Sequence, residues 1–150
     1  TSGIGLETAK QLAAMGANIH VISHNKDAAH VKAALDVIQK ASQSSPFLRS
    51  NSEDNIADEV LEKPEVVFTS VEFTDLVQVR DFCRRMRAAG TPIDILVNNA
   101  GILTQSQTIT KFGDDEMLAV NLLAPYLLTE GLLPLVEKAA GRIVNVSSSS

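Results

Sequence analysis

Two asparagines follow a mostly apolar stretch of the sequence and could bind a polar ligand. Residues 93–97 read Ile-Asp-Ile-Leu-Val and lead into Asn98, Asn99, Ala100 and Gly101. The apolar part predicts a buried strand. The asparagines could simply close a turn, because Asn tolerates left-handed backbone and bonds its own main chain. They could instead open a ligand crevice, since open α/β sheets bind ligands at the carboxyl ends of their strands.

The first residues have the composition of a phosphate-binding helix start. Ser2, Gly3, Ile4 and Gly5 lead directly into a helical stripe of apolar residues. Small residues there let the backbone approach a phosphate, and the unpaired N–H groups and the positive end of the helix dipole stabilise the anion. A tight turn explains Gly-x-Gly equally well. The strand expected before this motif, with the first glycine of the fingerprint, is missing from the sequence.

The histidines and the single cysteine form no recognisable reactive cluster. His20, His24 and His30 lack the spacing of a zinc site, so we expect no metal. Cys83 lies on a helical apolar stripe and has no second cysteine to pair with, so we predict that it belongs to the core. The fold therefore does not depend on an oxidising compartment, and we expect an intracellular location, cytoplasmic by default.

The composition indicates a soluble globular protein of one domain, with 150 residues of which 45% are hydrophobic. The net charge of −5 lacks the basic footprint of a nucleic-acid-binding protein, so we expect no nucleic-acid partner. Residues 117–136 form the one long apolar run, but an ionised Glu130 in hydrocarbon would be costly. A buried helix packed on a sheet is favoured over a membrane span, and membrane association of the whole protein is left open.

The rest of the sequence alternates between strand-like and helix-like segments. Strands are predicted over residues 17–23, 65–71, 93–98 and 142–150, and helices over 6–15, 27–41, 76–89 and 117–136, with Asp27, Thr74 or Asp75, and Gly141 as end signals. This rhythm predicts one α/β domain over residues 1–150, a doubly wound parallel sheet with helices on both faces. The polar residues 43–63 predict a surface insertion.

Together, four motifs resemble the short-chain dehydrogenase/reductase family: Ser2-Gly3-Ile4-Gly5, Asn98-Asn99-Ala100-Gly101, Asn121 in Leu-Ala-Val-Asn, and Arg-Ile-Val-Asn-Val-Ser-Ser from Arg142. They occur in the family's order and spacing. The residues of the last two motifs are similar to those of the retinol-dehydrogenase-like branch of the family. The resemblance implies a Rossmann-type fold that binds NADP or NAD, and an enzyme that transfers a hydride between that cofactor and an alcohol or carbonyl. Hydrophobic substrates such as retinoids and steroids are among the candidates.

The resemblance also implies where the cofactor would bind. Ser2 to Gly5 would line the pyrophosphate, and Asn99, Ala100 and Gly101 would flank the adenosine through close backbone approach. Glu72 stands where the family usually has an aspartate that bonds the adenine amino group, and Phe73 and Val120 join the cofactor-binding set. No acidic residue stands before Asp27 at the end of the second strand. His24 and Lys26 stand there instead, so we expect a preference for NADP over NAD, although both could be plain surface residues.

Two catalytic residues follow from the same resemblance. Ser148 matches the serine that bonds the substrate oxygen, and Asn121 matches the helix asparagine whose main chain holds a water in the proton relay. Plainer explanations are turn material for the serine run and a helix kink for the asparagine, which lies near Pro125. The family's tyrosine proton donor and its lysine follow the serine. The only tyrosine here, Tyr126, precedes it, so we expect these 150 residues alone to be inactive.

Two classes of function therefore stay open. The first is an NAD(P)-dependent oxidoreductase, with a small-molecule alcohol or carbonyl as its partner. The second is a non-catalytic dinucleotide-binding module that senses the cofactor or scaffolds another protein. The family often pairs subunits through its long helices, so we expect the whole protein to be a homodimer or homotetramer.

Overall fold

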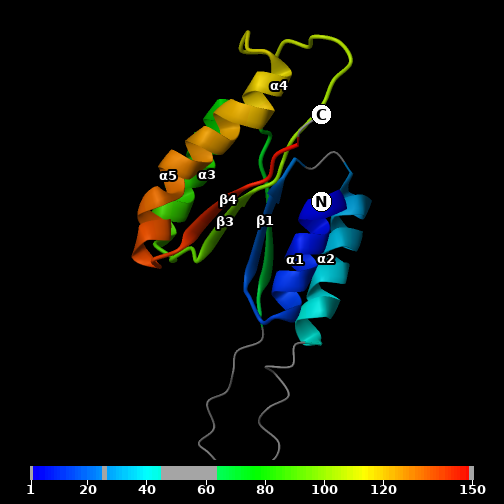
Figure 1. Cartoon of the computed structure of the whole chain (residues 1–150), viewed down its shortest axis with the longest axis vertical. Coiled ribbons are helices and arrows are strands. Elements are labelled where there is room, and N and C mark those ends of the chain that lie inside the picture. Colours follow the sequence, from blue (N-terminus) through cyan, green and yellow to red (C-terminus); the bar gives the residue numbers. More distant parts are fainter. Residues whose placement is uncertain (1, 25–26, 45–63, 149–150) are drawn as a thin grey trace, which may run out of the picture. The chain divides into compact units, whose positions relative to one another are not determined.

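The structure is a computed structural model that describes residues 2–24, 27–44 and 64–148. The chain divides into two compact units, residues 1–70 and residues 71–150, and each is described by itself. Helices and strands alternate through both units, and both strand pairs are parallel (Figure 1), which agrees with the α/β prediction. The predicted insertion at 43–63 lies outside the described residues, except for Gln43 at the end of a helix and Ser44 after it.

The first unit holds two helices that lie side by side against a parallel strand pair (Figure 1). Its elements are α1 (Gly3–Ala14), β1 (Ile19–Ser23), α2 (Ala28–Gln43) and β2 (Val66–Ser70). The pairing runs in register from Ile19 opposite Val66 to Ser23 opposite Ser70. Asp27 begins α2 as predicted, because its carboxylate accepts hydrogen bonds from Ala29 N and His30 N.

The second unit packs two long helices against each other beside a second parallel pair of strands. Its elements are α3 (Leu76–Ala89), β3 (Ile95–Asn98), α4 (Glu116–Leu118), the π-helical segment η2 (Ala119–Leu123), α5 (Ala124–Lys138) and β4 (Arg142–Asn145). The core between α3 and α5 is apolar and includes Val79, Phe82, Leu128, Leu132 and Leu135. Cys83 is also buried there, which confirms its predicted place.

The last strand is shorter and more exposed than the predicted buried strand over 142–150. β4 ends at Asn145, and only Ile143 within it is partly buried. Successive residues of a strand point to opposite faces, so an apolar run does not show that both faces are covered. Val144 is 43% exposed, and so is Ile95 in β3. The predicted strands at 17–23, 65–71 and 93–98 are likewise too long by one or two residues at their ends.

The end of α5 also differs from the prediction that Gly141 closes it. The left-handed residue is Ala140, with φ 49°, and the last turn is closed by Ala140 N donating to Glu137 O and Gly141 N donating to Val136 O. Gly141 is needed for a different reason. A Cβ there would collide with Ile93 O and lie 2.6 Å from Asp94 O. The glycine therefore lets the chain pass close to the backbone that precedes β3.

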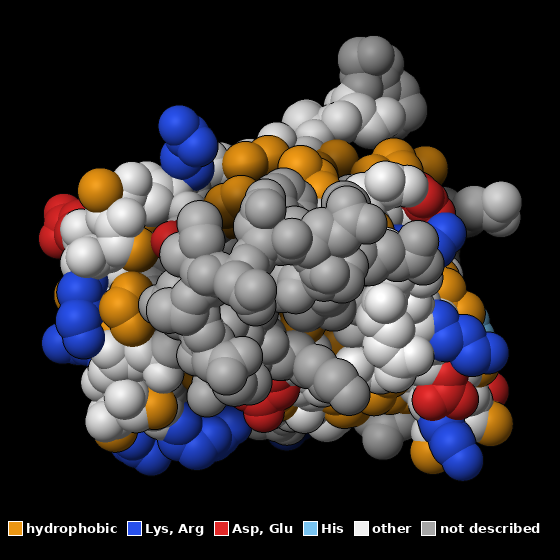
Figure 2. Space-filling view, turned by 90° about the horizontal axis from the view of Figure 1, so that it is seen from below, with side chains coloured by type: hydrophobic (Ala, Val, Ile, Leu, Met, Phe, Trp, Pro, Cys, Tyr) orange, Lys and Arg blue, Asp and Glu red, His pale blue; other side chains and the backbone are white. Residues whose placement is uncertain are grey.

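The continuous helical stretch Glu116–Lys138 is, among the described residues, the one helix long and apolar enough to cross a membrane. This is weak evidence, because the core helix of a soluble protein passes the same test. Its contacts with α3, β3 and β4 fit the predicted buried helix. Hydrophobic side chains also reach the surface among charged ones (Figure 2), and on this helix they include Leu118, Leu122 and Tyr126.

Candidate functional site

The parallel pairing of β3 and β4 brings two of the predicted motifs to the same edge. Asn98 lies opposite Asn145, and Val146 N donates to Asn98 O at 3.0 Å. The chain therefore leaves both strands side by side, with Asn99–Gly101 on one and Ser147–Ser148 on the other. This edge is the carboxyl end of the pair, where α/β sheets bind ligands.

Asn98 is the buried anchor of this edge. Its Nδ2 donates to Asn145 Oδ1 at 2.8 Å and to Thr129 Oγ1 of α5 at 3.1 Å, and the residue is only 9% exposed. Its own Oδ1 is buried without a hydrogen-bond partner among the described residues. The first asparagine thus ties β3 to β4 and α5 and does not reach toward a ligand. Neither Thr129 nor Asn145 was assigned a role of its own from the sequence, although both are polar residues inside apolar segments.

Asn121 holds the loop that follows Gly101. Its Oδ1 accepts from Ile102 N and its Nδ2 donates to Ile102 O, both at 2.8 Å. The residue lies in η2, where Ala124 N reaches back to Ala119 O and widens the helical turn. Such π segments are frequent at functional sites. Both ends of the side-chain amide bind the loop. The water-holding role predicted for the main chain of Asn121 stays a prediction.

The helix start at Ser2 to Gly5 is open. Ser2 occupies the capping position of α1, yet its side chain makes no capping hydrogen bond. Gly3 has φ 57°, a left-handed value that favours glycine, and a Cβ there would meet nothing within 4 Å. Ser2, Gly3 and Ile4 are exposed, so their main chain is accessible. An uncapped start of a 12-residue helix fits a phosphate.

At the end of β1 stands His24, which is exposed and whose carbonyl oxygen accepts a hydrogen bond from Ser23 Oγ at 3.0 Å. α1 precedes β1 and packs on it, and Figure 1 places the start of α1 and the end of β1 at the same end of this unit. Asp27 is engaged by the first turn of α2. Lys26, the second predicted basic residue, lies outside the described residues.

The side chains of three predicted cofactor-binding residues, Glu72, Phe73 and Val120, differ in their exposure to solvent. Glu72 is half-buried, its N donates to Gln78 Oε1 at 3.2 Å, and its Oε1 accepts from Thr74 N at 3.4 Å. Phe73 and Val120 are only 7% and 6% exposed. Their side chains belong to the core, so a contact with a cofactor would fall to their main chain. The prediction from the sequence did not distinguish side-chain from main-chain contacts at these two residues.

Ser148 follows β4 and is exposed, and its hydroxyl has no hydrogen-bond partner among the described residues. Tyr126 lies on α5 and is 59% exposed. No hydrogen bond joins Ser148 to Asn121 in the part of the chain that the structure describes. The structure therefore supports a reachable hydroxyl at the strand edge and leaves its predicted role as a prediction.

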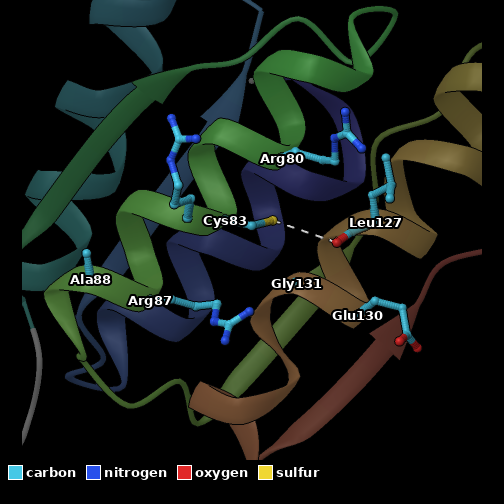
Figure 3. A pocket seen from close by; sticks show the side chains of 8 residues that line it. Arg80, Cys83, Arg87, Ala88, Leu127, Glu130 and Gly131 are labelled. Atoms are coloured by element: carbon cyan, nitrogen blue, oxygen red, sulfur yellow. Dashed lines mark hydrogen bonds between the residues drawn. The ribbon is translucent and has the colours of Figure 1, made fainter.

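A groove of about 630 Å³ lies between α3 and α5 (Figure 3). It is lined by Arg80, Cys83, Arg84, Arg87, Ala88, Leu127, Glu130 and Gly131. Burial raises the pKa of the Cys83 thiol, so the sulfur is protonated and a poor nucleophile. In the part of the chain that the structure describes, no group of three or more His, Cys, Asp or Glu side chains could hold a metal.

Comparison with known proteins shows which protein family this chain is similar to. The family model described as short chain dehydrogenase matches residues 45–150. The chain is 31% identical to mouse retinol dehydrogenase 12 over 148 residues, and 30% identical to the chloroplastic short-chain dehydrogenase TIC 32 A of Brassica napus over 154 residues. These matches cover 98% and 99% of the chain but only 40% and 42% of the relatives. The chain thus spans about two fifths of their length.

The fold is shared with solved structures as well. A metagenomic short-chain oxidoreductase crystallised with NADP superposes with a TM-score of 0.71 at 26% identity. The match covers 99% of this chain and 59% of that one. The likeness confirms the predicted Rossmann-type α/β class.

Proposed function

The chain belongs to the short-chain dehydrogenase family, and we propose that its whole protein is an NAD(P)-dependent oxidoreductase acting on an alcohol or carbonyl. The observation that carries this proposal is the shared edge of β3 and β4, where Asn99–Gly101 and the hydroxyls of Ser147 and Ser148 emerge together. The open start of α1 supports a dinucleotide, because its free N–H groups suit a pyrophosphate. When bound, the nicotinamide supplies or accepts the hydride.

In this proposal each group of the chain has a defined task. The main chain from Ser2 to Gly5 binds the pyrophosphate, and Glu72 accepts a hydrogen bond from the adenine. Asn121 fixes the Ile102 backbone, which keeps the Asn99–Gly101 segment in place for the adenosine. Ser148 donates its hydroxyl proton in a hydrogen bond to the reacting oxygen. A donor aimed at developing charge stabilises the transition state more than the ground state.

The test is a comparison of two neighbouring serines in the whole protein. We expect Ser148→Ala to lower kcat about a hundredfold, which is the usual cost of removing one such donor. Ser147→Ala is the matched control and should be milder, because adjacent residues of an extended chain face opposite sides. Steady-state kinetics with a panel of alcohols measures both. Equal losses from the two substitutions would show that the serine run is structural.

We further propose that the cofactor is NADP rather than NAD. The support is local: His24 follows β1, and the nearest described carboxylate, Asp27, is engaged at the start of α2. A carboxylate at the end of β1 would bond the ribose hydroxyl and repel a 2′-phosphate. We expect His24→Asp to shift the kcat/KM ratio toward NAD. A wild-type protein that already prefers NAD would contradict the proposal.

The substrate, partners and location are proposed on separate grounds. The 31% sequence identity to mouse retinol dehydrogenase 12 supports an apolar alcohol or its carbonyl as the substrate.

Leu118, Leu122 and Tyr126 are exposed at four-residue spacing on one continuous helical stretch, which supports a homodimer or homotetramer formed through this stripe. Leu122→Glu should then lower the mass measured by sedimentation. For location we propose the cell interior, which imaging of a tagged protein would test.

We propose that a polypeptide of these 150 residues alone has no turnover. Proton transfer needs a donor beside the reacting oxygen, and the only tyrosine of the sequence stands on α5, ahead of Ser148. Assays of this polypeptide against carbonyls with NADPH should give the background rate. Binding of the cofactor by the whole protein without turnover would instead favour the non-catalytic binding module.

A further inference from the structure

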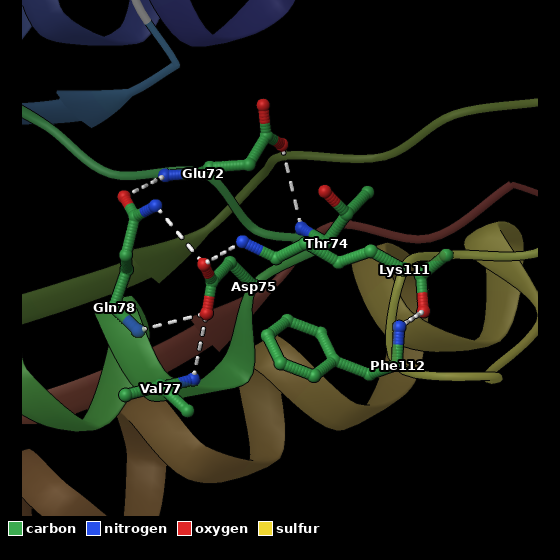
Figure 4. Close-up of polar contacts among 8 residues, drawn as sticks. Glu72, Thr74, Asp75, Val77, Gln78, Lys111 and Phe112 are labelled. Carbon is green, nitrogen blue, oxygen red and sulfur yellow. Dashed lines mark hydrogen bonds and ion pairs between the residues drawn. The ribbon is translucent and has the colours of Figure 1, made fainter.

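The loop between β3 and α4 ends in a tight turn that presents Lys111. Thr110 closes this turn: its N donates to Asp114 O at 2.8 Å, and its Oγ1 accepts from Phe112 N and Asp114 N, both at 3.3 Å. Gly113 supplies the left-handed residue with φ 91°. From this turn the Lys111 side chain crosses the Phe112 ring, 4.8 Å from its centroid (Figure 4).

Lys111 ends on a buried carboxylate. Its Nζ lies 2.7 Å from Oδ2 of Asp75, whose side chain is 8% exposed. Asp75 also begins α3, because its Oδ1 accepts from Val77 N at 3.1 Å and from Gln78 N at 3.3 Å. The hydrogen bond from Lys111 lowers the pKa of Asp75, against the opposing effect of burial. The carboxylate is therefore ionised, and Lys111 supplies the cation that it faces.

Gln78 relays this arrangement to Glu72. Its Nε2 donates to the same Asp75 Oδ2 at 3.2 Å, and its Oε1 accepts from Glu72 N at 3.2 Å. The donor end of the amide can only face the carboxylate, and the acceptor end can only face the main-chain N–H. A single orientation of Gln78 satisfies both (Figure 4). The Glu72 N–H is thus held through Gln78 by the Asp75 carboxylate that Lys111 neutralises, while Asp75 N donates directly to Glu72 O at 3.0 Å.

We propose that Lys111 is a positioning residue for the adenine end of the cofactor site. It acts through Asp75 and Gln78, which hold the Glu72 segment where its carboxylate meets the adenine. This inference rests on the proposed function, because it needs Glu72 to face a bound dinucleotide. Without the cation, the Asp75 carboxylate would draw in water or another donor, which would compete with the Gln78 amide for Asp75 Oδ2 and weaken its hold on Glu72 N.

The experiment measures binding equilibria in the whole protein. ADP probes the adenine end, and nicotinamide mononucleotide probes the other end. We expect Lys111→Met to weaken ADP binding about tenfold, the effect of misplacing one charge-assisted hydrogen bond. Nicotinamide mononucleotide should bind within twofold of wild type. Lys111→Arg should restore ADP binding, and Gln78→Leu should reproduce the loss without touching the ion pair.

The control is Lys138→Met. Lys138 Nζ also makes a 2.7 Å hydrogen bond, to Gly90 O at the far end of α3, so its loss removes a similar contact away from Glu72. Unchanged ADP binding in Lys111→Met and Gln78→Leu would overturn the inference, and so would an equal loss in Lys138→Met. Failure of wild-type protein to bind either NADP or NAD would instead overturn the proposed function.

Discussion

Substituting Gly141 and its neighbour Ala140 should change stability in opposite directions. In Gly141→Ala the new methyl group would collide with Ile93 O and lie 2.6 Å from Asp94 O. Both atoms are main chain, and Asp94 O already accepts from Arg142 N at 2.8 Å, so neither side can move without breaking the start of the β3–β4 pair. Forcing an extra methyl into such a contact costs about 1–3 kcal/mol, and we expect the upper end of that range.

Ala140→Gly should instead stabilise the protein. Ala140 holds φ 49°, which costs an L-residue about 1–2 kcal/mol. Glycine removes that strain, but the larger conformational entropy of its unfolded chain costs about 0.4–1 kcal/mol, so the net gain is between about 0 and 1.6 kcal/mol. The two closing hydrogen bonds to Val136 O and Glu137 O are main-chain bonds and survive the change.

Urea unfolding of the whole protein, followed by circular dichroism, measures both changes in unfolding free energy. Each variant is the control for the other, because the two positions are adjacent and the substitutions exchange glycine and alanine in opposite directions. A Gly141→Ala protein as stable as wild type would refute the close-approach argument. An Ala140→Gly protein less stable than wild type would refute the assignment of the left-handed cap.

Two further predictions concern α3. A Cβ on Gly131 would lie 2.7 Å from both Cβ and Sγ of Cys83, so Gly131→Ala should destabilise the α3–α5 contact, and adding Cys83→Ala should recover part of the loss in a thermal-melt double-mutant cycle. The pKa of Asp75 is lowered by the hydrogen bond from Lys111, so its stabilising effect is present above the unfolded pKa and is lost as pH falls through the folded value. The unfolding free energies of wild type and Lys111→Met should therefore differ at neutral pH, begin to converge below about pH 4, and meet once the pH is below the folded pKa of Asp75.

The sequence predicted best those elements whose ends carry a local signal. α3 was predicted with its observed bounds, because Asp75 caps its start and Gly90, with φ 71°, follows its end. Asp27 gave the start of α2 in the same way. Strand ends carry no comparable signal, since a strand stops where its partner stops pairing. The predicted strands therefore ran too long, and β4 was wrongly expected to be buried.

The site was harder to predict, because its contacts join residues far apart in the chain. Lys111 and Asp75 are separated by 36 positions, and Asn98 and Asn145 by 47. Neither pair belongs to one element, so no periodicity connects its members. Gly141 shows the same limit. Its place after a helix indicated a cap, whereas a steric contact with Ile93 and Asp94, almost 50 residues earlier, requires it.

The two most distinctive polar residues of the site, Asn98 and Asn121, use their side chains to hold other parts of the protein, Asn98 from a buried position and Asn121 from the surface. The first ties β3 to Asn145 and Thr129, and the second grips the Ile102 main chain with donor and acceptor together. Aspartate has nearly the same shape but no N–H donor. At position 98 it could make neither of the two hydrogen bonds, and at position 121 it could keep only the one from Ile102 N, which explains why carboxamides suit both positions. The groups left to meet a ligand at this edge include the main chain from Asn99 to Gly101 and the serine hydroxyls. Recognition by main-chain atoms requires a backbone held in place, and the hydrogen bonds of the buried Asn98 amide and the exposed Asn121 amide supply that rigidity.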